Sequence, residues 1–184
     1  NTASRCSASP PRRRCSRTAP ARTDELAPRR WPVPLRHVTA LPRRLLPDTA
    51  GVGDGGWLTI GGCSIHDLAT EYGTPLFVYD EDHLRARCGE AVQAFGAGNA
   101  YYATKAFLCR AMARLAYDEG MRLDVATGGE LHVALAAGVP ASACTMHGNN
   151  KSVAELRLAI GAGVGHIVVD SFDELDRLEA LLGP

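Results

Sequence analysis

Apolar and polar residues alternate in two regular ways along residues 51–184 of this chain. Short apolar runs, which are typical of buried strands, are followed by segments in which apolar residues recur every three or four positions, as on one face of a helix. From residue 100 onward the alternation predicts four strands, at 100–104, 121–126, 143–147 and 165–170. It predicts a helix after each of them, at 107–119, 129–137, 152–162 and from 171 onward.

The stretch before residue 100 carries a less regular version of the same alternation. Trp57–Ile60 lies between two pairs of glycines and predicts a short strand, and Pro75–Tyr79 predicts another. Ser64 and Asp80 are residues suited to cap the amphipathic helices that follow them.

The repeated strand–helix units predict an α/β fold with a parallel sheet. The run Ile167–Val169 is apolar at every position, as expected of a parallel strand covered on both faces. No G-x-G-x-x-G follows a predicted strand, which disfavours a dinucleotide-binding sheet. The short units favour a (β/α)₈ barrel of the TIM type, of which residues 45–184 would form the N-terminal half. A doubly wound sheet is the alternative.

Residues 1–44 have a different composition from the rest of the chain. Residues 1–50 contain 11 arginines, no lysine and three acidic residues, whereas the remainder is acidic. Low hydrophobicity, charge and proline predict a disordered Arg/Pro-rich extension. A nucleic-acid-binding arm, a transit peptide and a reading-frame artefact are alternatives. The acidic remainder argues against nucleic acid as a partner.

The cysteines and apolar runs exclude several classes of protein. The six cysteines are scattered and form no C-x-x-C pair or metal-ligand spacing, so we expect reduced thiols in a cytoplasmic protein without a metal site. No apolar run approaches the roughly 20 residues that span a bilayer. The chain begins with Asn and ends within a repeating pattern, so we expect a fragment.

Polar side chains accompany three successive predicted strands. Lys105 follows the first, Asp124 and Glu130 lie on and after the second, and His147 ends the third. The C-terminal strand ends of a β/α barrel carry its functional site, so these residues are the candidates. Structural explanations also exist. Lysines are usually solvated, the helix dipole favours a carboxylate at Glu130, and His147 can be a core residue. An isolated buried carboxylate needs a cationic partner, which favours a functional Asp124.

Two serine–glutamate pairs predict capping boxes at helix starts, Ser152 with Glu155 and Ser171 with Glu174. Capping therefore explains the polar pair Asp170-Ser171 without any functional role.

Three motifs in order resemble those of a known family. The run Tyr102–Phe107, followed by Met112-Ala113 and Gly120, resembles the pyridoxal-phosphate attachment signature of the fold-type III decarboxylases, the ornithine, diaminopimelate and arginine decarboxylase group. Three further runs resemble the diaminopimelate decarboxylase branch: Gly73–Asp80, Leu123–Leu131 and His147–Ser152. The family usually carries Ser where Thr127 stands and often Asn where Phe107 stands.

The resemblance implies pyridoxal 5′-phosphate as cofactor and Lys105 as its covalent attachment point. Burial in an apolar strand would lower the pKa of Lys105 and leave part of its amine unprotonated for attachment. Asp124 would pair with or orient the lysine, and Glu130 would partner the pyridine nitrogen. Ala103 would leave room beside the ring, and His147 would complete the cofactor site.

The resemblance also implies decarboxylation of meso-2,6-diaminopimelate to L-lysine by a homodimer. Another amino-acid decarboxylase of the ornithine or arginine type, or a non-catalytic relative, is the alternative. The family's ring-stacking His, Gly-rich phosphate loop, Glu-Pro-Gly-Arg segment and C-terminal β-domain have no counterpart in the printed sequence. We therefore expect these 184 residues alone to be inactive and poorly soluble.

Overall fold

The computed structural model describes residues 42–183. The Arg/Pro-rich extension expected over residues 1–44 lies almost wholly outside them, and Arg43–Leu45 forms a short 3₁₀ turn. No helix within residues 42–183 is both long and apolar enough to cross a membrane.

A small antiparallel sheet comes first along the described chain. Strand β1 (Gly51–Val52) pairs with β2 (Leu58–Ile60), and β2 pairs with β3 (Cys63–Ser64). Helix α1 (Ile65–Tyr72) follows, and its N-cap Ser64 accepts a hydrogen bond from the Asp67 amide. The strand and the cap expected here are confirmed.

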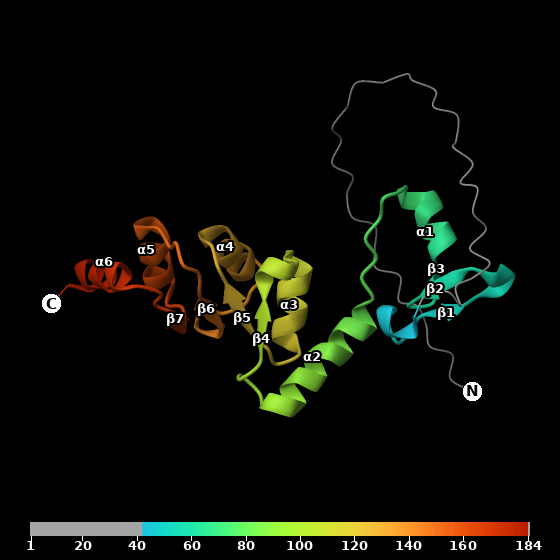
Figure 1. Cartoon of the computed structure of the whole chain (residues 1–184), viewed down its shortest axis with the longest axis horizontal. Coiled ribbons are helices and arrows are strands. Elements are labelled where there is room, and N and C mark those ends of the chain that lie inside the picture. Colours follow the sequence, from blue (N-terminus) through green and yellow to red (C-terminus); the bar gives the residue numbers. More distant parts are fainter. Residues whose placement is uncertain (1–41, 184) are drawn as a thin grey trace, which may run out of the picture. The chain divides into compact units, whose positions relative to one another are not determined.

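A four-stranded parallel sheet forms the second part (Figure 1). Its strands are β4 (Tyr101–Ala103), β5 (Arg122–Val125), β6 (Cys144–Met146) and β7 (His166–Ile167). Helix α2 (Glu81–Phe95) precedes the sheet, and α3 (Arg110–Asp118), α4 (Gly128–Ala136), α5 (Val153–Ala162) and α6 (Phe172–Leu182) follow its strands in turn. The strands lie in sequence order without reversal. That order is the order of a β/α barrel, whereas a doubly wound sheet reverses at a switch point.

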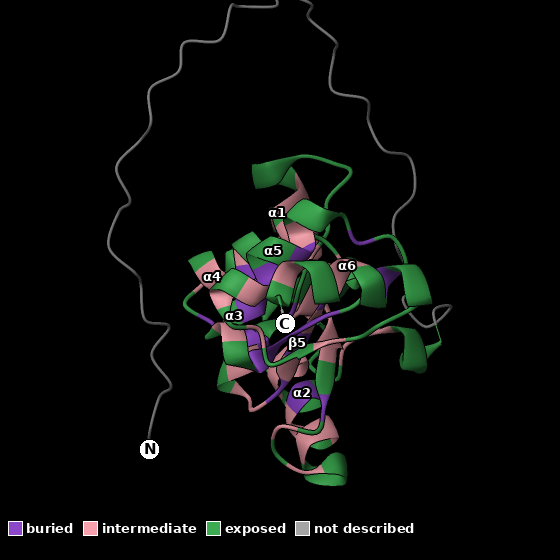
Figure 2. Ribbon diagram, turned by 90° about the vertical axis from the view of Figure 1, so that its left-hand side faces the viewer, coloured by how far each residue is buried: buried purple, intermediate pink, exposed green. Residues whose placement is uncertain are grey.

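The core of this part lies between the sheet and its covering helices. Leu123 and Val125 of β5 are fully buried, as are Leu131 and Ala134 of α4 (Figure 2). The apolar stripe of α3 is equally well defined, with Ala113 completely buried. The burial of alternate β5 residues shows that the helices cover one face of the sheet.

Three local expectations were wrong. Residues 75–79 form no strand, because no described segment pairs with them. Helix α3 begins at Arg110 instead of Phe107, because Thr104–Ala106 turns as a 3₁₀ helix and Phe107 is extended. Val168 and Val169 lie beyond the short β7 and are each 39% exposed, so they are not covered on both faces.

One of the two expected capping boxes forms. At α5, the Ser152 side chain and the Glu155 carboxylate satisfy each other's backbone amides. At α6, the Ser171 hydroxyl accepts from the Glu174 amide at 3.3 Å, but the Glu174 carboxylate bonds the Asp170 amide and Lys151 instead. The two oxygens of the Glu174 carboxylate are therefore bonded to Lys151 and to the Asp170 amide, and the second half of the capping box does not form.

Candidate functional site

Side chains of the parallel sheet form a row on the face that the helices do not cover. Asp124 of β5 lies in register with Ala103 of β4 and Thr145 of β6, and Thr145 is in register with His166 of β7. We call these four residues the inner row. A hollow of about 460 Å³ lies at this face, and its lining includes Asp124, Thr145, His166 and the adjacent His147.

Lys105 follows the inner row directly along the chain, two residues after Ala103. It is exposed in the 3₁₀ turn after β4, and within residues 42–183 its amine forms no hydrogen bond or ion pair. The expected burial of Lys105 is therefore not found, because the buried residue of this turn is its neighbour Thr104, which is 1% exposed. The amine is sterically free to bond covalently with a carbonyl compound.

Asp124 and His147 face each other at the edge of the hollow. His147 Nδ1 lies 3.4 Å from Asp124 Oδ2 and 3.3 Å from Oδ1. The Asp124 side chain is 26% exposed and that of His147 is 55% exposed. Asp124 Oδ1 is itself buried and has no hydrogen-bond partner among the described residues, so the carboxylate retains an acceptor for a further cation or N–H group.

Glu130 ties the strand ends together. Its Oε2 accepts hydrogen bonds from the Ala126 amide and from Thr104 Oγ1, the latter at 3.1 Å. Thr104 Oγ1 also lies 2.9 Å from the Asp124 carbonyl, so its single proton is shared between two acceptors. These contacts make Glu130 a support for the turn that carries Lys105. That it also partners a pyridine nitrogen stays a prediction.

Sequence reasoning missed a buried ion pair close to the site. Lys151 Nζ lies 2.9 Å from Glu174 Oε1, and the two side chains are 0% and 5% exposed. Burial alone would raise the pKa of the Glu174 carboxyl, but hydrogen bonds from Lys151 and the Asp170 amide lower that pKa below its usual value. The scarcity of lysine points to Lys151 as a special residue, since Lys105 and Lys151 are the only two lysines in the sequence. No sequence pattern identifies Glu174 as the partner of Lys151.

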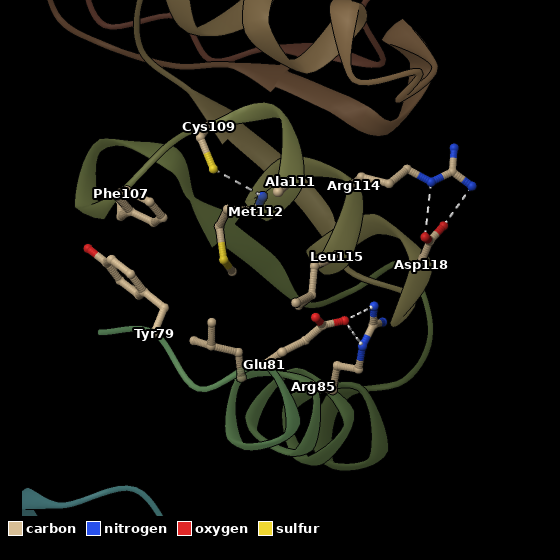
Figure 3. Close-up of a pocket in the computed structure, with 11 residues that line it drawn as sticks. Tyr79, Glu81, Arg85, Phe107, Cys109, Ala111, Met112, Arg114, Leu115 and Asp118 are labelled. Atoms are coloured by element: carbon tan, nitrogen blue, oxygen red, sulfur yellow. Dashed lines mark hydrogen bonds and ion pairs between the residues drawn. The ribbon is translucent and has the colours of Figure 1, made fainter. Parts of the chain in front are cut away.

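A second hollow, of about 420 Å³, lies between α2 and α3 (Figure 3). Figure 3 shows Met112 and Leu115 directed into it and the stacked rings of Tyr79 and Phe107 at one end. Its lining also includes Arg85, which pairs with Glu81 and with Glu119, and the ion pair of Arg114 with Asp118. None of the candidate site residues lines this hollow.

The parallel strands lie in sequence order, as they do in part of a β/α barrel. A lysine whose amine has no partner within residues 42–183 follows the first strand, and polar groups lie at the next two. This arrangement is suited to hold a carbonyl cofactor. Comparison with known proteins identifies the class of protein to which the chain belongs. The chain belongs to the pyridoxal-dependent decarboxylases, because the profile of their pyridoxal binding domain matches residues 81–183. The expected family and the pyridoxal cofactor are thereby confirmed.

Curated relatives are similar over most of this chain. Diaminopimelate decarboxylase of Mycobacterium tuberculosis is 52% identical over 159 residues, which are 86% of this chain and 32% of that protein. The enzyme of Mycobacterium leprae is 54% identical over 143 residues, 77% of this chain and 29% of that protein. The chain thus spans about a third of the length of the curated relatives it matches.

Solved structures agree with the fold. Diaminopimelate decarboxylase from M. jannaschii has a TM-score of 0.67 at 31% identity, covering 73% of this chain and 33% of that one. Lysine/ornithine decarboxylase from Vibrio vulnificus, complexed with putrescine, has a TM-score of 0.56 at 30% identity, covering 63% and 32%. The expected α/β architecture and its barrel family are therefore confirmed.

The described residues fit a pyridoxal cofactor. Within residues 42–183, the exposed amine of Lys105 has no hydrogen-bond partner. In the same residues, Asp124 Oδ1 is a buried acceptor that makes no hydrogen bond, although His147 Nδ1 lies 3.3 Å away. Ala103, the inner-row residue two positions before Lys105, is in register with Asp124 and has only a methyl side chain. Within residues 42–183, no group of three or more His, Cys, Asp or Glu side chains could hold a metal ion.

Proposed function

We propose that the protein carrying this chain is a pyridoxal-phosphate-dependent carboxy-lyase that converts meso-2,6-diaminopimelate to L-lysine and CO₂, the last step of lysine biosynthesis. The position of Lys105 carries the proposal. It lies free and exposed directly after β4, beside the inner row, in a chain that is 52% identical to diaminopimelate decarboxylase of M. tuberculosis over 159 residues.

Each candidate residue has a role that its contacts support. Lys105 attaches the cofactor through its amine when that amine is unprotonated. Asp124, with a free carboxylate oxygen, accepts a hydrogen bond from a cationic or N–H group beside Lys105. His147 has Nδ1 against Asp124, which fixes the ring and leaves Nε2 as the nitrogen that can exchange a proton with a bound group. The bound cofactor supplies an electron sink for the electrons left when the carboxylate departs.

Glu130 and Ala103 act on geometry in this proposal. Glu130 bonds both Thr104 and the Ala126 amide, so it fixes the turn that carries Lys105 relative to the end of β5. Ala103 keeps the space beside Lys105 open, because a larger side chain in the inner row would fill part of it. Glu130 as partner of the pyridine nitrogen remains part of the proposal.

The whole protein acts as a cytoplasmic homodimer in this proposal. A decarboxylase that prefers ornithine or a related diamino acid is the second candidate. It is supported by the structural likeness to the lysine/ornithine decarboxylase of V. vulnificus, a TM-score of 0.56 at 30% identity.

Substrate profiling of the full-length protein with pyridoxal phosphate tests the proposal. We expect CO₂ release from meso-diaminopimelate to exceed that from ornithine or arginine by about 100-fold or more in kcat/KM, since the determinants of diamino-acid choice are polar. Lys105→Ala should abolish turnover and the absorption band of the lysine-bound cofactor. Preference for ornithine would support the second candidate, and turnover by Lys105→Ala would contradict both.

A further inference from the structure

The buried ammonium group of Lys151 uses all three of its protons. Nζ donates to the Gly148 carbonyl, to the Val168 carbonyl at 2.8 Å and to Glu174 Oε1 at 2.9 Å. A lysine has three donors and no acceptor, so the hydrogen bonding of this buried group is complete. We call this set of contacts the Lys151 clasp.

The clasp joins three segments that are separate in the sequence. Gly148 belongs to the loop between β6 and α5, Val168 follows β7, and Glu174 lies in the first turn of α6. Two further bonds extend it, since Glu174 Oε2 accepts from the Asp170 amide at 2.9 Å and Arg177 Nη1 donates to the Lys151 carbonyl at 3.0 Å. Two neighbouring strand ends are therefore held by one side chain.

The clasped loop is the one that presents His147. Gly148 follows His147 directly and has a φ of +119°, a conformation that side chains rarely adopt. A Cβ at this glycine would lie 3.2 Å from the Ala126 carbonyl, so the loop packs closely on the end of β5. A shift of the Gly148 carbonyl would therefore move His147 relative to Asp124.

We propose that Lys151 is a positioning residue, which holds the loop 147–150 against the end of β7 and thereby fixes His147 beside Asp124 in the cofactor site. The functional half of this inference rests on the proposed function; the loop restraint does not. Stability alone does not require the clasp, because buried ion pairs are often replaced by apolar or neutral residues without loss of stability. Within the clasp, however, the ammonium group is the donor to both the Gly148 and the Val168 carbonyls, and an apolar side chain cannot replace it there.

Two variants of the full-length protein separate positioning from stability. Lys151→Met removes the clasp and leaves Glu174 buried and unpaired. Lys151→Met with Glu174→Gln removes the clasp and the unpaired charge together, while the side-chain carbonyl oxygen of the introduced glutamine still accepts from the Asp170 amide. Arg114→Met, which breaks an exposed ion pair on α3, is the matched control.

Three quantities are measured: the midpoint of thermal unfolding, amide hydrogen exchange in residues 147–150 without cofactor, and the Kd of pyridoxal phosphate. We expect Lys151→Met to lower the midpoint, and the double variant to recover most of it. In the double variant, exchange at 147–150 should still be about tenfold faster than wild type, and the cofactor Kd about tenfold weaker. The Arg114→Met control should leave the exchange and the Kd unchanged.

Wild-type exchange at 147–150 in the double variant would overturn the proposal, even if Lys151→Met alone failed to fold. Recovery of the wild-type cofactor Kd together with the unfolding midpoint would also overturn it, because the clasp would then serve stability only. A wild-type protein that binds no pyridoxal phosphate would instead contradict the proposed function. The exchange comparison is made without cofactor, so it would still decide whether Lys151 restrains the loop.

Discussion

The hydrogen bond between Thr104 and Glu130 gives a quantitative test of how the Lys105 turn is held. Thr104 is 1% exposed, and its hydroxyl lies 3.1 Å from Glu130 Oε2. A hydrogen bond to a charged acceptor contributes about 1.5–3 kcal/mol. Glu130 is partly exposed, and water screens its charge, so we expect a coupling of about 1 kcal/mol. That corresponds to about a fivefold change in the unfolding equilibrium.

A double-mutant cycle isolates this coupling. Thr104→Val, Glu130→Ala and the combined variant of the full-length protein are compared with wild type by urea denaturation. The Ala126 amide loses its acceptor in both Glu130 variants, so that loss cancels from the cycle. Thr104→Val combined with Arg114→Met, a pair without shared contacts, is the control and should be additive. A Thr104–Glu130 coupling below about 0.3 kcal/mol would refute the reasoning, because pairs of distant, independent sites deviate from additivity by about that much.

Three further predictions concern stability, pH and the isolated chain. Leu131→Ala, at a fully buried position of α4, should lower the free energy of unfolding by about 2–5 kcal/mol in urea denaturation. Leu158→Ala, at a position of α5 that is 44% exposed, should lower it by less than about 1 kcal/mol. Equal decreases in the two variants would contradict the core assignment. The pKa of Glu174 is lowered from an ordinary value of 4.5. The ionised carboxylate should therefore stabilise the folded protein fully above pH 4.5, and this stabilisation should be lost as the pH falls through the lower pKa of the folded state. Comparing wild type with Glu174→Gln between about pH 6 and pH 3 checks this, and parallel stability profiles would count against it. The 184-residue polypeptide alone should be poorly soluble and release no CO₂ from meso-diaminopimelate, and clear turnover would overturn that expectation.

The sequence predicts the parallel sheet well because its strands and helices have strong, regular patterns. The apolar spacing around Leu123 and Leu131 reflects burial on one face, and the structure buries both completely. The order of the strands follows from short connections, which leave little choice of topology. Residues 75–79 show the limit of such patterns. A β-prone run forms a strand only where another strand can pair with it, and none of the described strands does.

For the candidate site, the sequence predicts the positions of the residues along the strands but not their contacts. Strand ends placed Lys105, Asp124 and His147 at one edge of the sheet, since parallel strands end together. The pairing of Asp124 with His147, 23 residues apart, depends on side-chain geometry that no local pattern encodes. Local pattern was misleading at Glu174. Its spacing from Ser171 matches a capping box, yet its carboxylate bonds Lys151, which is distant in sequence.

The most direct test of the central claim is to locate the lysine that the cofactor modifies. The full-length protein is incubated with pyridoxal phosphate, the adduct is fixed with borohydride, and its peptides are mapped by mass spectrometry. The printed sequence contains two lysines, Lys105 and Lys151, and Lys151 is buried with all its protons in hydrogen bonds. We predict a label on Lys105 and none on Lys151. An unlabelled Lys105, or a label on Lys151 instead, would contradict the account.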